Sequence, residues 1–317
     1  YAGISDATTL NFTTTTAPVS AGDGGSTSSP PSTTDLDATA AYGTLSTAID
    51  GTAMNADDKA KASAALTGFL ATTSTVTVST VTLTPSGSNA QTFTISGSGT
   101  ATEAMIIDVS GLPPGCTLVF DNVEFAVIVG SISISGGSGR NYVVGDSASQ
   151  SIVLGAEDDT RAGGDGNDNI GSAAGNDLLS GGDGMDSVFG GLGNDIVLGN
   201  QGQDLVFGNQ GLDTAFGGGG DDLVFGGMDN DWIWSDDGND YLSGDDGADV
   251  CFGGTGNDSL YGGTGNDSLS GEGGDDLLYG DAGADTLTGG AGTDNFLYLS
   301  TAEGGDQIVD FTSGQDR

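Results

Sequence analysis

The segment GGTGNDSLYGGTGNDSLS, residues 253–270, is two nearly identical nonapeptides in succession. Each copy has glycine at positions one, two and four, aspartate at position six and leucine at position eight. Outward from this segment, aspartate occupies position six in fifteen consecutive copies from Asp168 to Asp294, and Asp159 fits one step earlier. A fixed period over this length predicts a solenoid in which each repeat stacks on its neighbours.

The same register extends backwards to residue 136, with Asn141 and Gln150 in the acid position, so residues 136–297 form eighteen nonapeptides. Position eight is usually aliphatic, as at Ile170, Val206 and Leu260, and Cys251 stands there as a small apolar residue. Positions seven to nine therefore predict a three-residue strand whose middle residue points inward. Two nonapeptides would make one coil of turn, strand, turn and strand.

The composition limits the chemistry. The 317 residues include 45 Asp and Glu against 5 Lys and Arg, for a formal net charge of −40, and no histidine. Catalysis and zinc binding through imidazole are excluded, and binding to nucleic acid or insertion into a membrane is not expected. We therefore expect a protein that is not an enzyme.

The acidic residues are 40 Asp and only 5 Glu, beside 59 glycines. Short carboxylates in tight glycine-rich loops suit hard cations, so the pattern favours calcium over a transition metal. One inward aliphatic per nonapeptide contributes about 1.5–3 kcal/mol, whereas ordering each backbone residue costs about 1–2 kcal/mol. The apolar core is therefore too thin to stabilise the stack, and the Asp loops must contribute.

These nonapeptides resemble the RTX family, also called hemolysin-type calcium-binding repeats, over about half of the chain. The resemblance implies a right-handed parallel β-roll, export by type I secretion, and loop sites of the weak extracellular class, about 10⁻⁴–10⁻³ M. It also implies that each ion lies between loops two repeats apart, which allows up to about 14 Ca²⁺. The ligands it implies are the position-six carboxylates and backbone carbonyls at positions two and four. The carboxylates are Asp159, Asp168, Asp177, Asp186, Asp195, Asp204, Asp213, Asp222, Asp231, Asp240, Asp249, Asp258, Asp267, Asp276, Asp285 and Asp294, and the carbonyl residues are Gly164, Gly166, Gly182, Gly184, Gly191, Gly193, Gly254, Gly256, Gly263 and Gly265.

Several copies depart from the pattern. The copy at 154–162 places Arg161 in the core position, which with Gln150 predicts a weak joint near 145–162. Asp229 replaces a glycine and is expected in the left-handed region. Extra acids at position three favour solvation over metal ligation; they are Asp165, Asp183, Asp237 and Asp246.

The rest of the chain divides by composition. Residues 1–35 predict a Thr/Ser-rich arm or linker, 36–135 a small β-rich domain with one helix near 55–70, and 136–300 the calcium-binding roll. Strands are expected near 73–84, 91–96, 104–109, 117–120 and 123–129. Residues 301–317 resemble the start of the segment that follows such arrays, and we expect a longer polypeptide.

Three function classes fit the pattern. The first is a secreted structural protein of the cell surface or an extracellular assembly, such as a surface layer, sheath, filament or adhesin, with calcium as the folding and assembly ligand. The second is a calcium-folded secretion module of a larger RTX enzyme, a protease or lipase. The third is a toxin module. The composition favours the first.

The flanks of the inward residue face outward, and in the middle of the array they are apolar. Ordinary stacking along the ladder is one explanation. The other is a covered face for self-association or another surface component, because soluble monomers seldom expose large apolar patches. The residues proposed for such an interface are Trp232, Trp234, Phe216, Phe252, Phe207 and Phe225.

Overall fold

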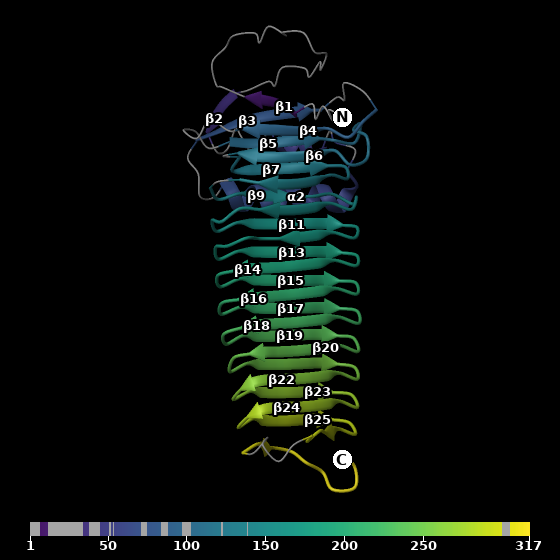
Figure 1. Ribbon diagram of the computed structural model, residues 1–317. Coiled ribbons are helices and arrows are strands. Elements are labelled where there is room, and N and C mark those ends of the chain that lie inside the picture. Colours follow the sequence, from purple (N-terminus) through teal and green to yellow (C-terminus); the bar gives the residue numbers. More distant parts are fainter. Residues whose placement is uncertain are drawn as a thin grey trace. The chain divides into compact units, whose positions relative to one another are not determined.

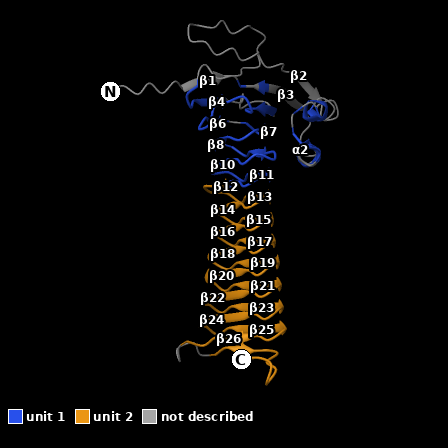
Figure 2. Cartoon of the chain, turned by 90° about the vertical axis from the view of Figure 1, so that its right-hand side faces the viewer, with its two compact units in different colours: residues 1–169 blue, residues 170–317 orange. Residues whose placement is uncertain are grey.

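The computed structural model describes residues 7–11, 34–37, 45–50, 52, 54–70, 75–83, 88–96, 103–121, 123–137, 139–299 and 305–317. Most of the expected arm lies outside these residues. The chain divides into two compact units, residues 1–169 (unit 1) and 170–317 (unit 2), coloured separately in Figure 2. This division falls within the nonapeptide register, which begins at residue 136.

Unit 1 is built from two sheets whose neighbouring strands run parallel, apart from one antiparallel pair, β2 with β3. One sheet has the order β1-β4-β6-β8-β10 and the other the order β2-β3-β5-β7-β9-β11. The strands expected from sequence are confirmed, and the chain winds from one sheet to the other and back. The bounds are β1 (Ala7–Asn11), β2 (Thr34–Asp37), β3 (Thr75–Thr82), β4 (Thr92–Ser96), β5 (Glu103–Asp108), β6 (Thr117–Asp121), β7 (Phe125–Val129), β8 (Ser133–Gly136), β9 (Tyr142–Val144), β10 (Ser151–Leu154) and β11 (Thr160–Asp165).

The predicted helix is confirmed as α2 (Ala56–Leu70), which begins directly after Asn55. A second helical segment at residues 45–50 was not predicted. Leu45, Ile49 and Leu66 are fully buried with Phe125 and Val127 of β7 in one apolar cluster. Unit 1 therefore has a conventional hydrophobic core beside its coils.

Unit 2 is a regular parallel stack, and the β-roll implied by the resemblance is confirmed (Figure 1). Even-numbered strands form one sheet and odd-numbered strands the other. β12 (Asn169–Gly171) spans the boundary between the units. The other bounds are β13 (Leu178–Asp183), β14 (Ser187–Leu192), β15 (Ile196–Gln201), β16 (Leu205–Gln210), β17 (Thr214–Gly219), β18 (Leu223–Met228), β19 (Trp232–Asp237), β20 (Tyr241–Asp246), β21 (Val250–Thr255), β22 (Ser259–Gly265), β23 (Ser268–Gly273), β24 (Leu277–Gly283), β25 (Thr286–Ala291), β26 (Asn295–Phe296) and β27 (Gln307–Ile308).

Pairing in unit 2 joins residues that are eighteen apart in sequence, as in Val206 with Val224 and Phe207 with Phe225, except between β25 and β27. Most strands are six residues long, twice the predicted length, because the ladder continues past position one. Asn209 at position two pairs with Gly227, and Gln210 at position three pairs with Met228. The glycine-rich turn residues therefore belong partly to the sheets.

The inward prediction for position eight is confirmed. Every side chain at this position in unit 2 except the last, Phe296, is almost fully buried, including Cys251 as a small apolar residue. The column is narrow, so each coil buries only two such side chains. None of the described helices is both long and apolar enough to cross a membrane.

Candidate metal-binding loops

The position-six aspartates lie in the loops that lead into each strand, and all of them are buried. Exposure of the residue is 3% or less at each one from Asp159 to Asp294. Sixteen buried carboxyl groups in a narrow stack are unusual, because a buried carboxylate is costly unless it is paired or hydrogen-bonded. The partners of the two carboxylate oxygens therefore decide what these loops can do.

From Asp195 to Asp294, one oxygen of each position-six carboxylate has a backbone partner in the preceding coil. The backbone N–H of Asp186 donates to Oδ1 of Asp204, and that of Asp204 donates to Oδ1 of Asp222, both at 2.8 Å. The same bond recurs along unit 2, from Asp177 with Asp195 to Asp276 with Asp294. The carboxylates thus form two continuous columns that cross-link coils eighteen residues apart.

The other oxygen has no hydrogen-bond partner in much of unit 2. Oδ2 is buried without one at Asp204, Asp213, Asp222, Asp231, Asp249, Asp258, Asp267 and Asp276. A buried unpartnered acceptor costs about 1–3 kcal/mol, and more when it carries charge. Because eight such atoms occur at equivalent positions, they are a regular feature of the loops. Their burial requires a group that compensates the lost hydrogen bonds and charge.

The glycine at position one borders this oxygen. A Cβ added to Gly199 would lie 2.5 Å from Oδ2 of Asp204 and 2.6 Å from the carbonyl oxygen of Gly217. Both neighbours are acceptors, and any side chain would fill the space between them. The same arrangement of one carboxylate and one carbonyl oxygen recurs at Gly190, Gly208, Gly226, Gly244, Gly253, Gly262 and Gly271.

The environment disfavours the charged carboxylate when only protein surrounds it. Burial raises the pKa of Asp204 to about 6 and that of Asp222 to about 7, against a hydrogen bond from the backbone that lowers it. At Asp231 burial, helped by the charges of Asp213 and Asp249, raises the pKa to about 8. A nearby positive charge would have the opposite effect.

These donors fit a hard cation. Carboxylate and carbonyl oxygens are the ligands that calcium prefers. The described residues contain no group of three or more Asp, Glu, Cys or His side chains that could hold a metal. A cation in these loops would therefore be held by no more than two carboxylates together with backbone carbonyls, among which the position-one carbonyls lie beside Oδ2.

The predicted carbonyl ligands at positions two and four stack coil on coil. A Cβ added to Gly254 would overlap the carbonyl oxygen of Asp236, and one added to Gly256 would overlap that of Gly238. These carbonyls therefore point along the stack, and their role as ligands stays a prediction. Sequence reasoning missed position one, although it is the more regular glycine: between residues 181 and 289 it is broken only by Ser235.

Ser235 changes one loop. Its hydroxyl donates to the carbonyl oxygen of Gly253 at 2.5 Å, and the side chain is fully buried. Burial raises the pKa of Asp240, while hydrogen bonds from the Asp222 backbone and the Ser235 hydroxyl oppose the rise. In this loop a hydroxyl thus lies beside the carboxylate of Asp240 and the carbonyl oxygen of Gly253. In the other loops the equivalent two oxygens border a glycine.

Asp159 is the second exception. Its Oδ1 accepts the backbone N–H of Asn141 at 2.7 Å, and its Oδ2 accepts a hydrogen bond from Nη2 of Arg161 at 2.6 Å. Both side chains are completely buried. Arg161 in the core position is therefore paired, and the weak joint expected near 145–162 stays a prediction.

The segment after the array continues the carboxylate columns. The backbone N–H of Asp285 donates to Oδ1 of Asp306 at 3.0 Å, and that of Asp294 donates to Oδ1 of Asp316 at 3.2 Å. Asp310 accepts from the backbone N–H of Gly289 and Gly290. Residues 305–317 therefore supply the acceptors that a further coil would have provided.

The outward residues form aromatic ladders. Trp234 stacks between Phe216 and Phe252, with ring centroids 5.0 and 5.5 Å away, and Phe207 stacks between Phe189 and Phe225 on the other sheet. Trp232 lies beside Trp234 and is 50% exposed. Stacking along the ladder is confirmed, whereas a covered face stays a prediction.

Comparison with known families gives one match. Residues 162–296 match the RTX calcium-binding nonapeptide repeat in four segments, at 162–197, 198–233, 225–260 and 261–296. These segments cover the loops in which Oδ2 lacks a partner. None of the curated proteins compared with the chain matches it.

Proposed function

We propose that the chain is a secreted structural protein of the cell surface or of an extracellular assembly. The premise is that residues 162–296 match the RTX calcium-binding nonapeptide repeat. In this proposal calcium is both its folding ligand and its assembly ligand, and the chain is not an enzyme. Surface layers, sheaths, filaments and adhesins are the assemblies that suit it.

The observation that carries the proposal is the row of buried Oδ2 atoms without a partner in unit 2. Residues 170–317 contain 28 of the 45 acidic residues and one cationic residue, Arg317, which gives a formal charge of −27. The chain therefore has almost no charge of its own to compensate these carboxylates. Calcium, when bound, would supply that positive charge and accept the oxygen ligands.

Calcium dependence supports a location outside the cell. Loop sites of this class have affinities of about 10⁻⁴–10⁻³ M, which suit extracellular calcium. A roll that folds only after export also suits the type I secretion that the resemblance implies. The carboxylates of unit 2 repel one another when calcium is scarce, so unit 2 would remain unfolded before export.

A structural role is supported by the outward face of unit 2. Trp232, Leu223 and Ile196 are each close to half exposed on regular parallel sheets. Flat rows of apolar side chains at a constant repeat can contact a second copy or another surface component over many coils. The finding that would favour the alternative, a secretion module of a larger enzyme, is a roll that folds with calcium and remains monomeric.

Imaging and spectroscopy of the same sample test the proposal. Purified full chain should show the circular dichroism of a β-protein in 5–10 mM calcium, which is above the expected dissociation constants of about 10⁻⁴–10⁻³ M. In EGTA it should lose the part of this signal that comes from unit 2. Electron micrographs in calcium should show ordered assemblies, and magnesium at equal concentration is the control. A spectrum unchanged by EGTA would refute calcium-dependent folding, and calcium-folded monomers at all concentrations would refute the structural role.

A further inference from the structure

The first three acid positions of the nonapeptide register, all in unit 1, differ from those of unit 2. Asn141 and Gln150 occupy two of them and carry no charge. The side-chain amide of Asn141 donates to the carbonyl oxygen of Val123, and that of Gln150 donates to Oδ1 of Asp146, both at 2.6 Å. Oδ1 of Asn141 and Oε1 of Gln150 are buried without a hydrogen-bond partner, but because these amides are neutral they leave no charge for an external cation to balance.

The third position is Asp159, whose charge is compensated by the chain itself. Arg161 stands at position eight, where the other repeats have an aliphatic residue, and its guanidinium reaches Oδ2 of Asp159 at 2.6 Å. In unit 2 the equivalent oxygen has no partner, for example at Asp204 and Asp231. A guanidinium is always charged and is the cation best suited to pair with a buried carboxylate.

Position one of the same repeat also differs. It is Leu154, which is buried at 3% exposure, whereas every repeat of unit 2 except those with Ser172 and Ser235 has glycine there. An added Cβ at the equivalent glycines would already meet Oδ2 and a carbonyl oxygen. A leucine side chain at this position leaves no room for an ion of the kind that the glycine loops fit.

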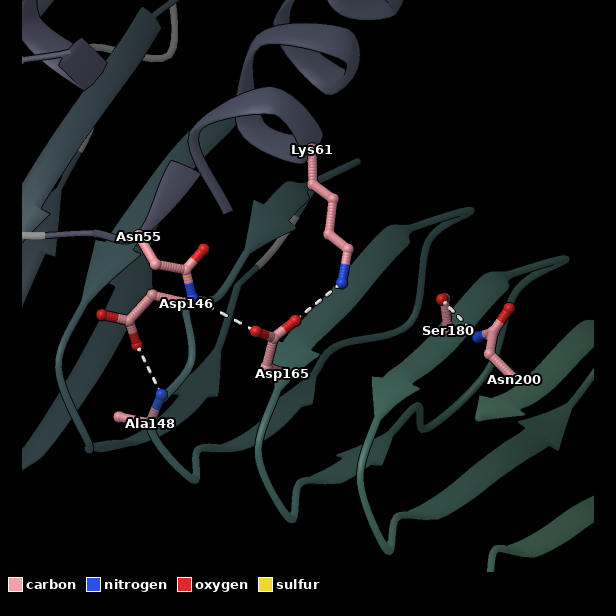
Figure 3. A network of polar contacts seen from close by, with 7 residues as sticks. All are labelled: Asn55, Lys61, Asp146, Ala148, Asp165, Ser180 and Asn200. Atoms are coloured by element: carbon pink, nitrogen blue, oxygen red, sulfur yellow. Dashed lines mark hydrogen bonds and ion pairs between the residues drawn. The ribbon is translucent and has the colours of Figure 1, made fainter. Parts of the chain in front are cut away.

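Two of the remaining cations of unit 1, Lys61 and Arg140, also pair with carboxylates. Four of the five Lys and Arg residues of the chain lie between residues 59 and 161. Lys61 on α2 makes an ion pair with Asp165 at 2.8 Å, and the Asn55 amide donates to the same carboxylate at 3.2 Å (Figure 3). Burial opposes charge on Asp165, but the hydrogen bond from Lys61 has the larger effect and lowers its pKa.

We infer that Arg161 is a built-in substitute for the cation at the Asp159 position, and that unit 1 up to Asp165 therefore folds without calcium. The requirement for calcium begins beyond that residue, in the glycine loops from Asp168 onward. This inference rests on the proposed calcium dependence of unit 2. It assigns Asp159 to the chain's own ion pair and makes Arg161 a positioning residue that holds a buried carboxylate.

Hydrogen exchange of the full chain, in calcium and in EGTA, separates the two units. Peptides from 103–165 should keep their protection within about twofold in EGTA, whereas peptides from 178–297 should lose it. Both tryptophans, Trp232 and Trp234, lie in unit 2, so their fluorescence reports its unfolding independently. Loss of protection in both units would overturn the inference and leave calcium-dependent folding standing. Retention in both would refute the proposed function instead.

Variants test the role of Arg161 itself. Arg161→Met keeps a long apolar stem but leaves the buried Asp159 charge uncompensated. In EGTA it should lower protection of residues 139–165 by a factor of about 100 or more. Arg140→Met is the matched control, because the Arg140–Asp158 ion pair at 2.9 Å is exposed. Its loss should lower the protection of the same residues by less than about fivefold.

The double variant Asp159→Asn with Arg161→Met removes both charges and should restore most of the protection in EGTA. A residue that served only to fill space would leave the single and double variants equally unprotected, and that result would overturn the assignment. Recovery in the double variant, together with loss in the single variant, would establish charge compensation.

Discussion

The backbone N–H of Asp213 donates to Oδ1 of Asp231 at 2.8 Å, so the carboxylate of one coil accepts a hydrogen bond from the backbone of the coil before it. The bond leaves Oδ2 of Asp231 facing the position-one glycine of its own loop, Gly226. One side chain therefore both joins two coils and offers an oxygen to a cation. Substitutions that remove one of these two roles, the hydrogen bond between coils or the oxygen offered to a cation, show how much each contributes to stability.

Asp267 can be changed to test both tasks. Asp267→Ala removes the acceptor of the Asp249 N–H, a bond of 2.9 Å, and should lower the free energy of unfolding by about 1–3 kcal/mol in calcium. Asp267→Asn keeps an acceptor and should lose mainly the calcium response. Hydrogen exchange should increase near Asp249 and Asp285 and stay unchanged near 187–205, because a solenoid couples neighbours. Uniform loss over unit 2 would contradict local coupling.

Ser235 predicts one loop that does not bind calcium. Ser235→Gly removes the hydroxyl beside Asp240 and the Gly253 carbonyl, so equilibrium dialysis should count one more bound calcium per chain. Ser268→Gly, at an exposed strand position, is the control and should leave the number unchanged. An unchanged number in Ser235→Gly would show that the hydroxyl does not block the loop.

The metal-free protein should be most stable in acid. Burial raises the pKa of Asp204, Asp222 and Asp231 from 3.8 to between about 6 and about 8, so the folded state binds protons more tightly than the unfolded state. The stability linked to this is fully present below pH 3.8 and is lost as pH rises to about 8.

Thermal unfolding in EGTA measures this dependence, and the midpoint should fall steadily from pH 4 to pH 8. In saturating calcium the trend should reverse, because protons compete with the cation for the carboxylates. A metal-free midpoint that rose with pH would contradict the burial of these groups.

The exposed tryptophan ladder predicts a contact surface. Trp232→Ser combined with Trp234→Ser should leave the number of bound calcium ions unchanged but reduce assembly at least about tenfold, since aromatic residues dominate interface energies. Leu178→Ser, on the same sheet and 40% exposed, is the control. Sedimentation in calcium measures the assembly, and normal assembly of the double variant would remove this surface from the proposal.

The regular half of the fold follows from its period. A buried position eight and a buried position six recur at one spacing, so the sequence alone predicts the sheets, the inward column and the Asp loops. Asp229, expected in the left-handed region, has φ of 74° there. These predictions hold because each depends only on the place of a residue within its repeat.

The coils of unit 1 that precede residue 136 were beyond such reasoning because their lengths vary. Thr92 pairs with Thr117, but Thr117 pairs with Ser133, and Ser133 with Ser151. No constant spacing marks them in the sequence, although they wind as the repeats do. The pairing of Arg161 with Asp159 was also missed. Position eight predicts that a side chain points inward, but it does not predict which group the end of a long side chain contacts.

Because paired residues are eighteen apart, residues can be inserted into the array without disturbing it only in multiples of eighteen. Two nonapeptides added together would give every backbone N–H the acceptor it has now, and every outward ladder would keep its own members. A single added nonapeptide would exchange the two sheets for everything downstream, so that the column of Phe216, Trp234 and Phe252 would be continued by residues of the opposite face. Duplication in pairs is therefore the change that this architecture tolerates, and the array could lengthen without redesign of the end segment that carries Asp306 and Asp316.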